Sequence, residues 1–235
     1  MPKLPGLSVF FPCYNEEPNV EPLVRRCLEF LPQFADIFEV IVVDDHSRDK
    51  TGEIADRLAA EDPRVRVVHH PENRGYGGAL QSGFQAATLP YVFFMDGDGQ
   101  FDIADLGPFV SSIREGVDAA LGYRVQRQDP FHRKLNAFCW GTLVNLLFGL
   151  GVRDVDCAYK LISRDKLRGM TLKSNGALIS TELLARLKKR HTRFVQLPVR
   201  HHPRTAGTQT GAKLSVILRA FKELFRFYRE LKKEA

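Results

Sequence analysis

Two aspartates one residue apart end an apolar run of the sequence. The run Tyr91-Val-Phe-Phe-Met95 leads directly into Asp96-Gly-Asp98. Short runs of β-branched and aromatic residues are typical of buried strands, which would place both carboxylates at a strand's C-terminal end. Because neighbouring carboxylates repel unless a cation or a proton compensates them, and because hard oxygen ligands suit Mg²⁺ or Mn²⁺ shared with phosphates, the spacing points to a metal-nucleotide site.

The same segment is compatible with other structures. Asp-Gly pairs are common in turns, so a plain turn stays open as an alternative. A calcium loop beginning at Asp96 needs Gly at its sixth position and Glu at its twelfth, where this chain has Phe101 and Gly107. A phosphatase-like nucleophile lacks its usual threonine two residues after Asp98, since Gln100 stands there. The calcium loop is excluded and the phosphatase-like site is disfavoured.

The elements that position these aspartates follow from the alternation of apolar and amphipathic segments over the first 120 residues. Strands are expected at Leu7–Phe11, Phe38–Val43, Val65–His69 and Tyr91–Met95. Helices are expected at Glu17–Phe30, Thr51–Ala60, Gly78–Ala87 and Ile103–Glu115. This repeated alternation predicts an α/β fold with a mostly parallel sheet covered by helices on both faces.

Every expected strand is followed by polar or turn-forming residues, which in a parallel sheet would meet at one edge and line one crevice. Asp44-Asp45-His46-Ser47 either caps the next helix or accepts hydrogen bonds from a base or ribose. The glycine-rich Asn73–Ala79 lacks dinucleotide-binding spacing and is better interpreted as a tight turn than as a phosphate contact. The neighbouring histidine pairs 69–70 and 201–202 are not expected to chelate, because adjacent strand residues face opposite ways.

Charge and cysteine usage restrict the class of partner. The 235 residues include 34 Lys and Arg against 28 Asp and Glu, a formal net charge of +6 that favours an anionic partner. No recognisable nucleic-acid module is present, so no nucleic acid is expected as a partner. The spacing of the four cysteines suggests neither zinc nor disulfides, and no signal peptide or spanning segment is visible. A cytoplasmic protein, with any membrane contact peripheral to the cytoplasmic face, is therefore expected.

The second half of the chain has a different pattern. An apolar and aromatic segment covers Phe131–Gly149, a strand is expected at Val195–Val199, and a polar loop follows at His201–Gly211. Lys213–Lys233 has apolar residues at spacings of three and four, with seven Lys or Arg against three Glu through Ala235. Such a helix can lie on a membrane surface, although packing on the domain or in a dimer interface is the alternative.

Five motifs occur in order along the chain: Pro12-Cys-Tyr-Asn-Glu16, Asp44-Asp45, Asn73-Arg-Gly-Tyr-Gly-Gly78, Asp96-Gly-Asp-Gly-Gln100 and Gly122-Tyr-Arg124. The set resembles family 2 glycosyltransferases of the GT-A fold, and within them the polyprenyl (dolichyl) phosphate sugar synthases. The likeness continues through Asp154–Lys160 and Arg204–Gly207. It implies one GT-A catalytic domain over residues 1–212, with a nucleotide-sugar half at 1–121 and an acceptor half at 122–212. An amphipathic helix would follow at 213–235.

The resemblance also implies roles for single residues. The nucleoside of a GDP- or UDP-sugar would be held by Pro12, Tyr14, Glu16, Val43 and Asp45. The metal, Mg²⁺ or Mn²⁺, would be bound by Asp96, Asp98 and Gln100 together with the donor diphosphate. Gly97 would lie along the nucleotide, and Arg204 would cover the donor site from a loop. The acceptor phosphate would meet Arg124 and Arg133, which with Asp98 form the implied catalytic set.

The implied reaction is the inverting, metal-dependent transfer of a hexose to polyprenyl phosphate. A phosphate monoester has its second pKa near about 6, so such an acceptor needs charge compensation by arginines rather than a general base. This chain departs from the family at Cys157-Ala158-Tyr159 and at Thr208-Gln209, which leaves the acceptor and sugar contacts open. Another lipid or saccharide acceptor, or a non-catalytic nucleotide-sugar-binding protein, remains an alternative. Absence of a Q-x-x-R-W signature argues against processive polysaccharide synthesis.

Overall fold

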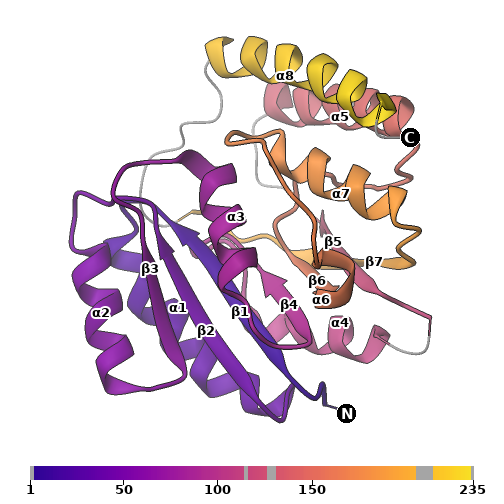
Figure 1. The fold of residues 1–235 in the computed structure, drawn as a ribbon. Coiled ribbons are helices and arrows are strands. Elements are labelled where there is room, and N and C mark those ends of the chain that lie inside the picture. The colour runs from indigo at the N-terminus through magenta and orange to yellow at the C-terminus, as the bar shows by residue number, and fades with distance from the viewer. Residues whose placement is uncertain (1–2, 114–115, 126–130, 205–213, 234–235) are drawn as a thin grey trace.

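A seven-stranded mixed sheet forms the centre of the molecule (Figure 1). The computed structural model describes all residues except 1–2, 114–115, 126–130, 205–213 and 234–235, and the side chains of 131–137 and 214–222 are also outside the description. The strands are β1 (Leu7–Cys13), β2 (Phe38–Asp44), β3 (Val65–His69), β4 (Tyr91–Phe94), β5 (Ala119–Val125), β6 (Lys160–Ser163) and β7 (Phe194–Arg200). The helices are α1 (Glu17–Phe30), α2 (Thr51–Glu61), α3 (Gly75–Ala86), α4 (Gly107–Ser112), α5 (Phe131–Phe148), α6 (Arg164–Leu167), α7 (Ile179–Lys189) and α8 (Leu214–Lys233), with short 3₁₀ helices η1 (Leu31–Gln33) and η2 (Ile103–Leu106).

The strand order β3-β2-β1-β4-β6-β5-β7 makes the sheet mostly parallel, as the sequence predicts. The strand β6 alone is antiparallel to both of its neighbours, β4 and β5. Every residue of β2 is buried, which is the signature of a parallel strand covered on both faces. Right-handed crossovers place α1 and α2 on one face, whereas α3 packs against β1 and β2 from the other (Figure 1).

Aromatic side chains fill the core on both sides of β4. The ring of Phe10 on β1 lies 5.0 Å from that of Phe84 on α3 and 5.5 Å from that of Phe94. The ring of Phe93, the next residue of β4, lies 4.6 Å from that of Tyr159. Because successive strand residues face opposite ways, these two clusters anchor β4 from both faces and fix where its C-terminal end lies.

Most of the expected elements are confirmed to within a few residues, and one is wrong in form. The single helix expected over Ile103–Glu115 is divided into η2 and α4, and Gly107-Pro108 stands at the junction. Proline cannot donate a backbone hydrogen bond, so it begins a helix rather than continuing one. The sequence interpretation also missed β5, β6 and α7.

We expect Gly83→Ala to destabilise the protein although alanine is the better helix former. A Cβ at Gly83 in α3 would overlap the buried ring of Phe10. Overpacking of this kind costs about 1–3 kcal/mol, which exceeds the gain of roughly 1 kcal/mol in helix propensity. Urea unfolding measures the difference. Gly141→Ala in α5 is the matched control, because a Cβ there meets nothing within 4 Å. A Gly83→Ala protein as stable as Gly141→Ala would contradict the packing argument.

Candidate functional site

The carboxyl ends of β1, β2 and β4 lie side by side, because β1 is hydrogen-bonded to both of the other strands. Pro12 is paired in register with Val43, and the backbone N–H of Asp45 donates to the Cys13 carbonyl at 2.9 Å. A Cβ at Gly97 would lie 2.8 Å from the Pro12 carbonyl oxygen. The loop after β4 therefore lies directly on the end of β1, and only glycine permits that approach.

This loop carries a carboxylate oxygen that has no partner. Among the described residues, no group hydrogen-bonds Oδ1 of Asp96, and this atom is buried. Burial, and then the charge of Asp98, raise the pKa of Asp96 to about 7. The hydroxyl of Tyr76 lies nearby: its pKa is raised well above the usual range by burial and by the Asp96 charge. A buried carboxylate is costly without a cation, so the position is suited to receive one.

Asp98 and Gln100 extend the polar edge of this loop. Oδ1 of Asp98 accepts from the backbone N–H of Gln100 at 3.1 Å, and its Oδ2 lies 4.0 Å from Nη1 of Arg204. The Gln100 amide nitrogen donates to the His202 carbonyl at 2.9 Å, which leaves the amide oxygen as the atom that a metal could use. Within the described ranges, no three His, Cys, Asp or Glu side chains form a metal cage. The donor set, two carboxylates and an amide oxygen, fits a hard divalent metal such as Mg²⁺, and Asp96, Asp98 and Gln100 would hold it.

Residues 201–204, which follow β7 late in the sequence, lie across the site. Arg204 donates to Oε1 of Glu16 at 2.6 Å, and Asn19 donates to Oε2 of the same carboxylate at 2.7 Å. Burial raises the pKa of Glu16, while the bonds from Asn19 and Arg204 act in the opposite direction. The backbone N–H of His202 also donates to the Gln100 carbonyl at 2.9 Å. The structure thus brings Glu16, Asp98, Gln100 and Arg204 together.

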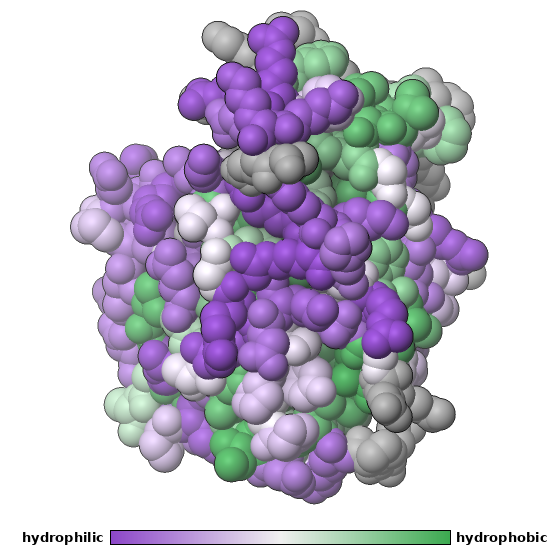
Figure 2. All heavy atoms as spheres, turned by 45° about the vertical axis from the view of Figure 1, so that its right-hand side comes forward, coloured by the Kyte–Doolittle hydropathy of each residue, from purple (hydrophilic) through white to green (hydrophobic). Residues whose placement is uncertain are grey.

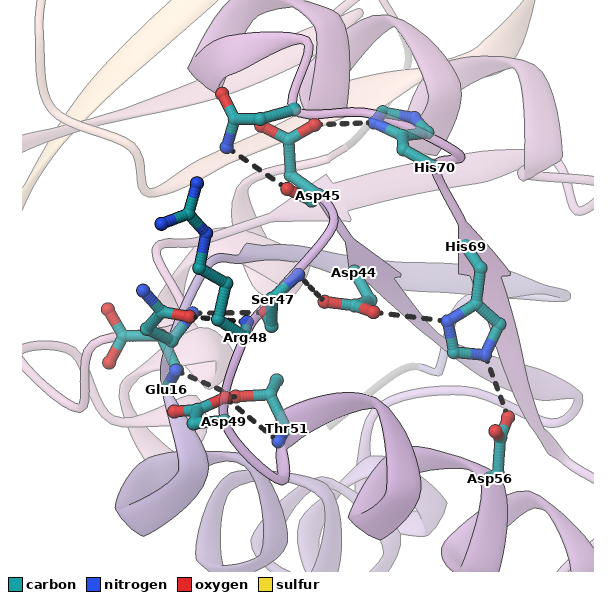
Figure 3. A network of polar contacts seen from close by, with 12 residues as sticks. Glu16, Asp44, Asp45, Ser47, Arg48, Asp49, Thr51, Asp56, His69 and His70 are labelled. Carbon is teal, nitrogen blue, oxygen red and sulfur yellow. Dashed lines mark hydrogen bonds and ion pairs between the residues drawn. The ribbon is translucent and has the colours of Figure 1, made fainter.

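Two neighbouring aspartates after β2 make different contacts (Figure 3). Asp44 accepts from the backbone N–H of Ser47 at 3.0 Å and contacts His69 at 3.1 Å, so it shapes the turn before α2. Asp45 instead contacts Nδ1 of His70 at 2.6 Å and accepts from the backbone N–H of Arg74 at 2.7 Å. Asp44 therefore stabilises the turn before α2 without capping that helix, whose N-cap residue Lys50 has no side-chain cap hydrogen bond. Asp45 faces the start of α3.

Arg124 is held by a bidentate ion pair at the end of β5. Its Nε and Nη2 each donate to Asp154 at 2.8 Å, with both side chains nearly buried. Burial opposes the charge, but the hydrogen bonds with Asp154 outweigh it and raise the pKa of Arg124. Lys160 is fully buried one strand away and donates to the carbonyls of Val155 and Cys157. These contacts fix the shape of the loop 154–159.

The glycines of the segment 73–79 serve packing, but they lie in the first turn of α3, which begins at Gly75, and not in a separate turn before the helix. Gly75 has φ +74°, and a Cβ there would lie 2.9 Å from the Asn175 carbonyl oxygen. The backbone N–H of Gly77 donates to the same carbonyl at 2.9 Å, and a Cβ at Gly77 would overlap the Ser174 carbonyl oxygen. The glycines therefore let α3 begin directly against the segment 174–175.

Some predicted positions are not described and some contributors were missed. The side chain of Arg133, the pair Thr208-Gln209 and the proposed domain boundary at residue 212 lie outside the described residues. Tyr14 is exposed at the site, as a ligand-facing side chain would be. Tyr76 and Lys160 lie within the sequence motifs, but the sequence interpretation gives neither of them a role. An aromatic residue within a glycine turn, and a lysine within an otherwise apolar strand, were the signals available.

Comparisons with known proteins agree with this geometry. The sequence model described as "Glycosyl transferase family 2" matches residues 8–170. Glycosyltransferase AglD of Haloferax volcanii is 36% identical over 207 residues, covering 84% of this chain and 33% of the relative. Polyprenol monophosphomannose synthase of Mycolicibacterium smegmatis is 30% identical over 211 residues, covering 85% and 78%. The chain spans about a third to a half of the length of the first two curated relatives it matches, at 33% and 48%.

Solved structures show the same fold. Glucosyl-3-phosphoglycerate synthase from Mycobacterium tuberculosis, in complex with Mn²⁺, uridine diphosphate and phosphoglyceric acid, has a TM-score of 0.67 at 20% identity. The alignment covers 96% of this chain and 75% of that structure, which makes the fold GT-A as expected. The matched family model, the relatives and the fold together place this chain in glycosyl transferase family 2.

Proposed function

We propose that this chain transfers a hexose from a GDP- or UDP-sugar to polyprenyl phosphate, with inversion and with a divalent metal. The observation that carries the proposal is the buried Oδ1 of Asp96, which no described residue hydrogen-bonds, beside Asp98 at the carboxyl ends of β1 and β4. Carboxylates so placed match the chemistry of an Mg²⁺ or Mn²⁺ ion that also binds a diphosphate. Relatives named for polyprenyl-phosphate sugar transfer, from Mycolicibacterium smegmatis and Micrococcus luteus, support the acceptor class.

The residues proposed for the donor surround this loop. Pro12 lies near the end of β1 and pairs in register with Val43 of β2. Tyr14 and Glu16 follow β1, and Asp45 follows β2. Gly97 keeps the loop close to Pro12, and Arg204 lies across from Glu16. When bound, the metal would neutralise charge on the leaving nucleoside diphosphate. Asp96, Asp98 and Gln100 would hold it.

The acceptor reaction needs charge compensation more than proton transfer. A lipid phosphate is largely a dianion at neutral pH, so one of its oxygens can attack the anomeric carbon without a general base. The new C–O bond forms as the bond to the nucleoside diphosphate breaks, and that group leaves with the electron pair. Arg124 provides the positive charge for the incoming phosphate, because Asp154 fixes its guanidinium through Nε and Nη2 and leaves Nη1 for a ligand.

We expect Asp98→Asn to abolish transfer without unfolding the protein. Replacing the Asp98 carboxylate by an amide removes one of the two negative charges that would hold the metal. Asparagine has the same shape as aspartate, so the contact with the Gln100 backbone is preserved. The assay incubates purified protein with Mg²⁺ or Mn²⁺, polyprenyl phosphate and labelled GDP- or UDP-sugars, and counts label in the organic phase. Label should appear with one donor and disappear with EDTA. The loss for Asp98→Asn should exceed about a hundredfold.

Asp105→Asn is the matched control for this experiment. Asp105 belongs to η2, and its hydrogen bonds among the described residues are with Arg200, at 2.6 Å, and with Asp102. Its replacement should leave transfer unchanged. Transfer by Asp98→Asn that persists in EDTA would contradict the metal mechanism. Nucleotide binding without transfer to polyprenyl phosphate would point to another acceptor or to a binding protein.

We expect Arg124→Lys to weaken the use of acceptor but not the binding of donor. A lysine cannot form the planar fork that joins Arg124 to Asp154, so the charge would lose its fixed direction. The ratio kcat/KM for polyprenyl phosphate should fall by at least about tenfold. The Kd for the nucleotide should not change. Arg153→Lys is the control, since the Arg153 guanidinium lies over the Tyr123 ring, 4.7 Å from its centroid, whereas Arg124 forms the ion pair with Asp154.

A lipid acceptor requires contact with a membrane, and α5 offers the exposed apolar surface for it. Phe138 and Leu146 of α5 are 70% and 81% exposed, and Phe225 of α8 is 50% exposed. Figure 2 shows hydrophobic surface at the upper right of the molecule, at the height where α5 and α8 lie in Figure 1. Leu224 and Phe227 are buried, so the described half of α8 packs on the domain. In the described parts of the chain, no helix has the length and hydropathy needed to cross a bilayer.

We expect the double variant Phe138→Asp with Leu146→Asp to lose binding to anionic vesicles. Burying two such side chains in a bilayer surface contributes roughly 2–5 kcal/mol, and two added carboxylates would also repel anionic lipid. Co-sedimentation with phosphatidylglycerol vesicles measures the bound fraction. Ile37→Asp is the control, because Ile37 is 63% exposed at the opposite, amino edge of the sheet. Equal sedimentation of both variants would exclude this face as the membrane contact.

A further inference from the structure

Two Asp–His pairs stand next to each other at the ends of β2 and β3, and they point in opposite directions (Figure 3). His69 contacts Asp44 at 3.1 Å and Asp56 of α2 at 2.9 Å. His70 contacts Asp45 at 2.6 Å, and its side chain is only 4% exposed. The first pair faces the helix α2, and the second faces the start of α3.

The second pair continues into a chain of hydrogen bonds. Nε2 of His70 lies 2.8 Å from the Ser82 hydroxyl, and Nη1 of Arg74 donates to the same hydroxyl at 3.2 Å. The backbone N–H of Arg74 donates to Oδ1 of Asp45 at 2.7 Å, which closes a ring of four residues. A buried network of this kind holds its members in one arrangement when all their polar groups are satisfied.

The two ends of this ring decide which atoms donate. A carboxylate can only accept, so the ring proton on Nδ1 of His70 donates to Oδ1 of Asp45. A guanidinium can only donate, so the Ser82 oxygen accepts from Arg74, and the serine hydroxyl can give its own proton to Nε2 of His70. Both bonds to Asp45 use Oδ1. Its other carboxylate oxygen is therefore the one left for a ligand.

We propose that His70 is a positioning residue that aims Asp45 at the nucleoside of the donor, with Ser82 and Arg74 holding the Nε2 side of the His70 ring in place. The inference deepens the proposed function and depends on it. The ligand group it serves is an N–H of the base or a hydroxyl of the ribose, since a carboxylate oxygen accepts from either. His69 has no such role, because its partners Asp44 and Asp56 belong to the turn and helix α2.

The test compares His70→Asn with His70→Leu, two side chains of nearly equal shape. Asparagine places an N–H close to the position of Nδ1, whereas leucine leaves Oδ1 of Asp45 without that donor. Titration calorimetry with Mg²⁺ measures Kd for UDP, GDP and inorganic pyrophosphate. His70→Leu should weaken the preferred nucleotide by about tenfold or more, and His70→Asn by less than about threefold. Pyrophosphate, which has no nucleoside, should bind all variants equally.

His69→Leu is the matched control and should bind the nucleotide as the wild type does. Equal nucleotide binding by His70→Leu and wild type would overturn the inference, as would equal losses for nucleotide and pyrophosphate, which indicate a general defect. If His70→Leu does not fold, the same comparison of nucleotide binding with pyrophosphate binding is made with Ser82→Ala. A wild-type protein that binds neither UDP nor GDP would instead refute the proposed function and the inference with it.

Discussion

Placing two carboxylates together at the buried end of a parallel strand is the constraint on which the rest of this structure depends. The charge of Asp98 and the burial of the site both act against ionisation of Asp96. The described surroundings reduce that cost only in part. Arg124 and Lys160 lower the pKa of Asp96 from a distance, and Arg204 lies 4.0 Å from Asp98. A bound cation would offset the repulsion that remains, which is the role of the metal in the proposed function.

The topology of the sheet explains how distant segments reach this point. The parallel order β2-β1-β4 brings three strand ends together, so residues 12–16, 43–45 and 96–100 become neighbours. Strand β6 is antiparallel, so its amino end adjoins the carboxyl end of β4, where Lys160 pairs in register with Phe94. The loop before β6 therefore delivers Asp154 to Arg124. One reversed strand thus joins the proposed donor half of the site to the proposed acceptor half.

The features of this structure that could be predicted from the sequence are those that a short stretch of neighbouring residues encodes. Strands β1 to β4 were recognisable because their apolar runs are short and bounded by polar turns, and β3 was predicted with its observed ends. Strand β6 is four residues long and contains a charged lysine, so no periodic pattern identified it. The pairing of Glu16 with Arg204 joins residues 188 positions apart, and no local pattern in the sequence encodes it. Motif residues were predictable as candidates, but their partners were not.

The side chains of the site differ in how firmly the surrounding residues hold them before any ligand binds. Asp45 and Arg124 each lie in closed networks, with Oδ1 of Asp45 bonded twice and Arg124 bonded in bidentate fashion to Asp154. Arg204 and Gln100 instead join the residues after β1 and β4 to residues 202–204. The proposed transfer needs both fixed and exchangeable contacts, because two substrates must enter and two products must leave. Preorganised groups lose little entropy on binding, whereas under the proposed function Arg204 would exchange Glu16 and Asp98 for the donor diphosphate.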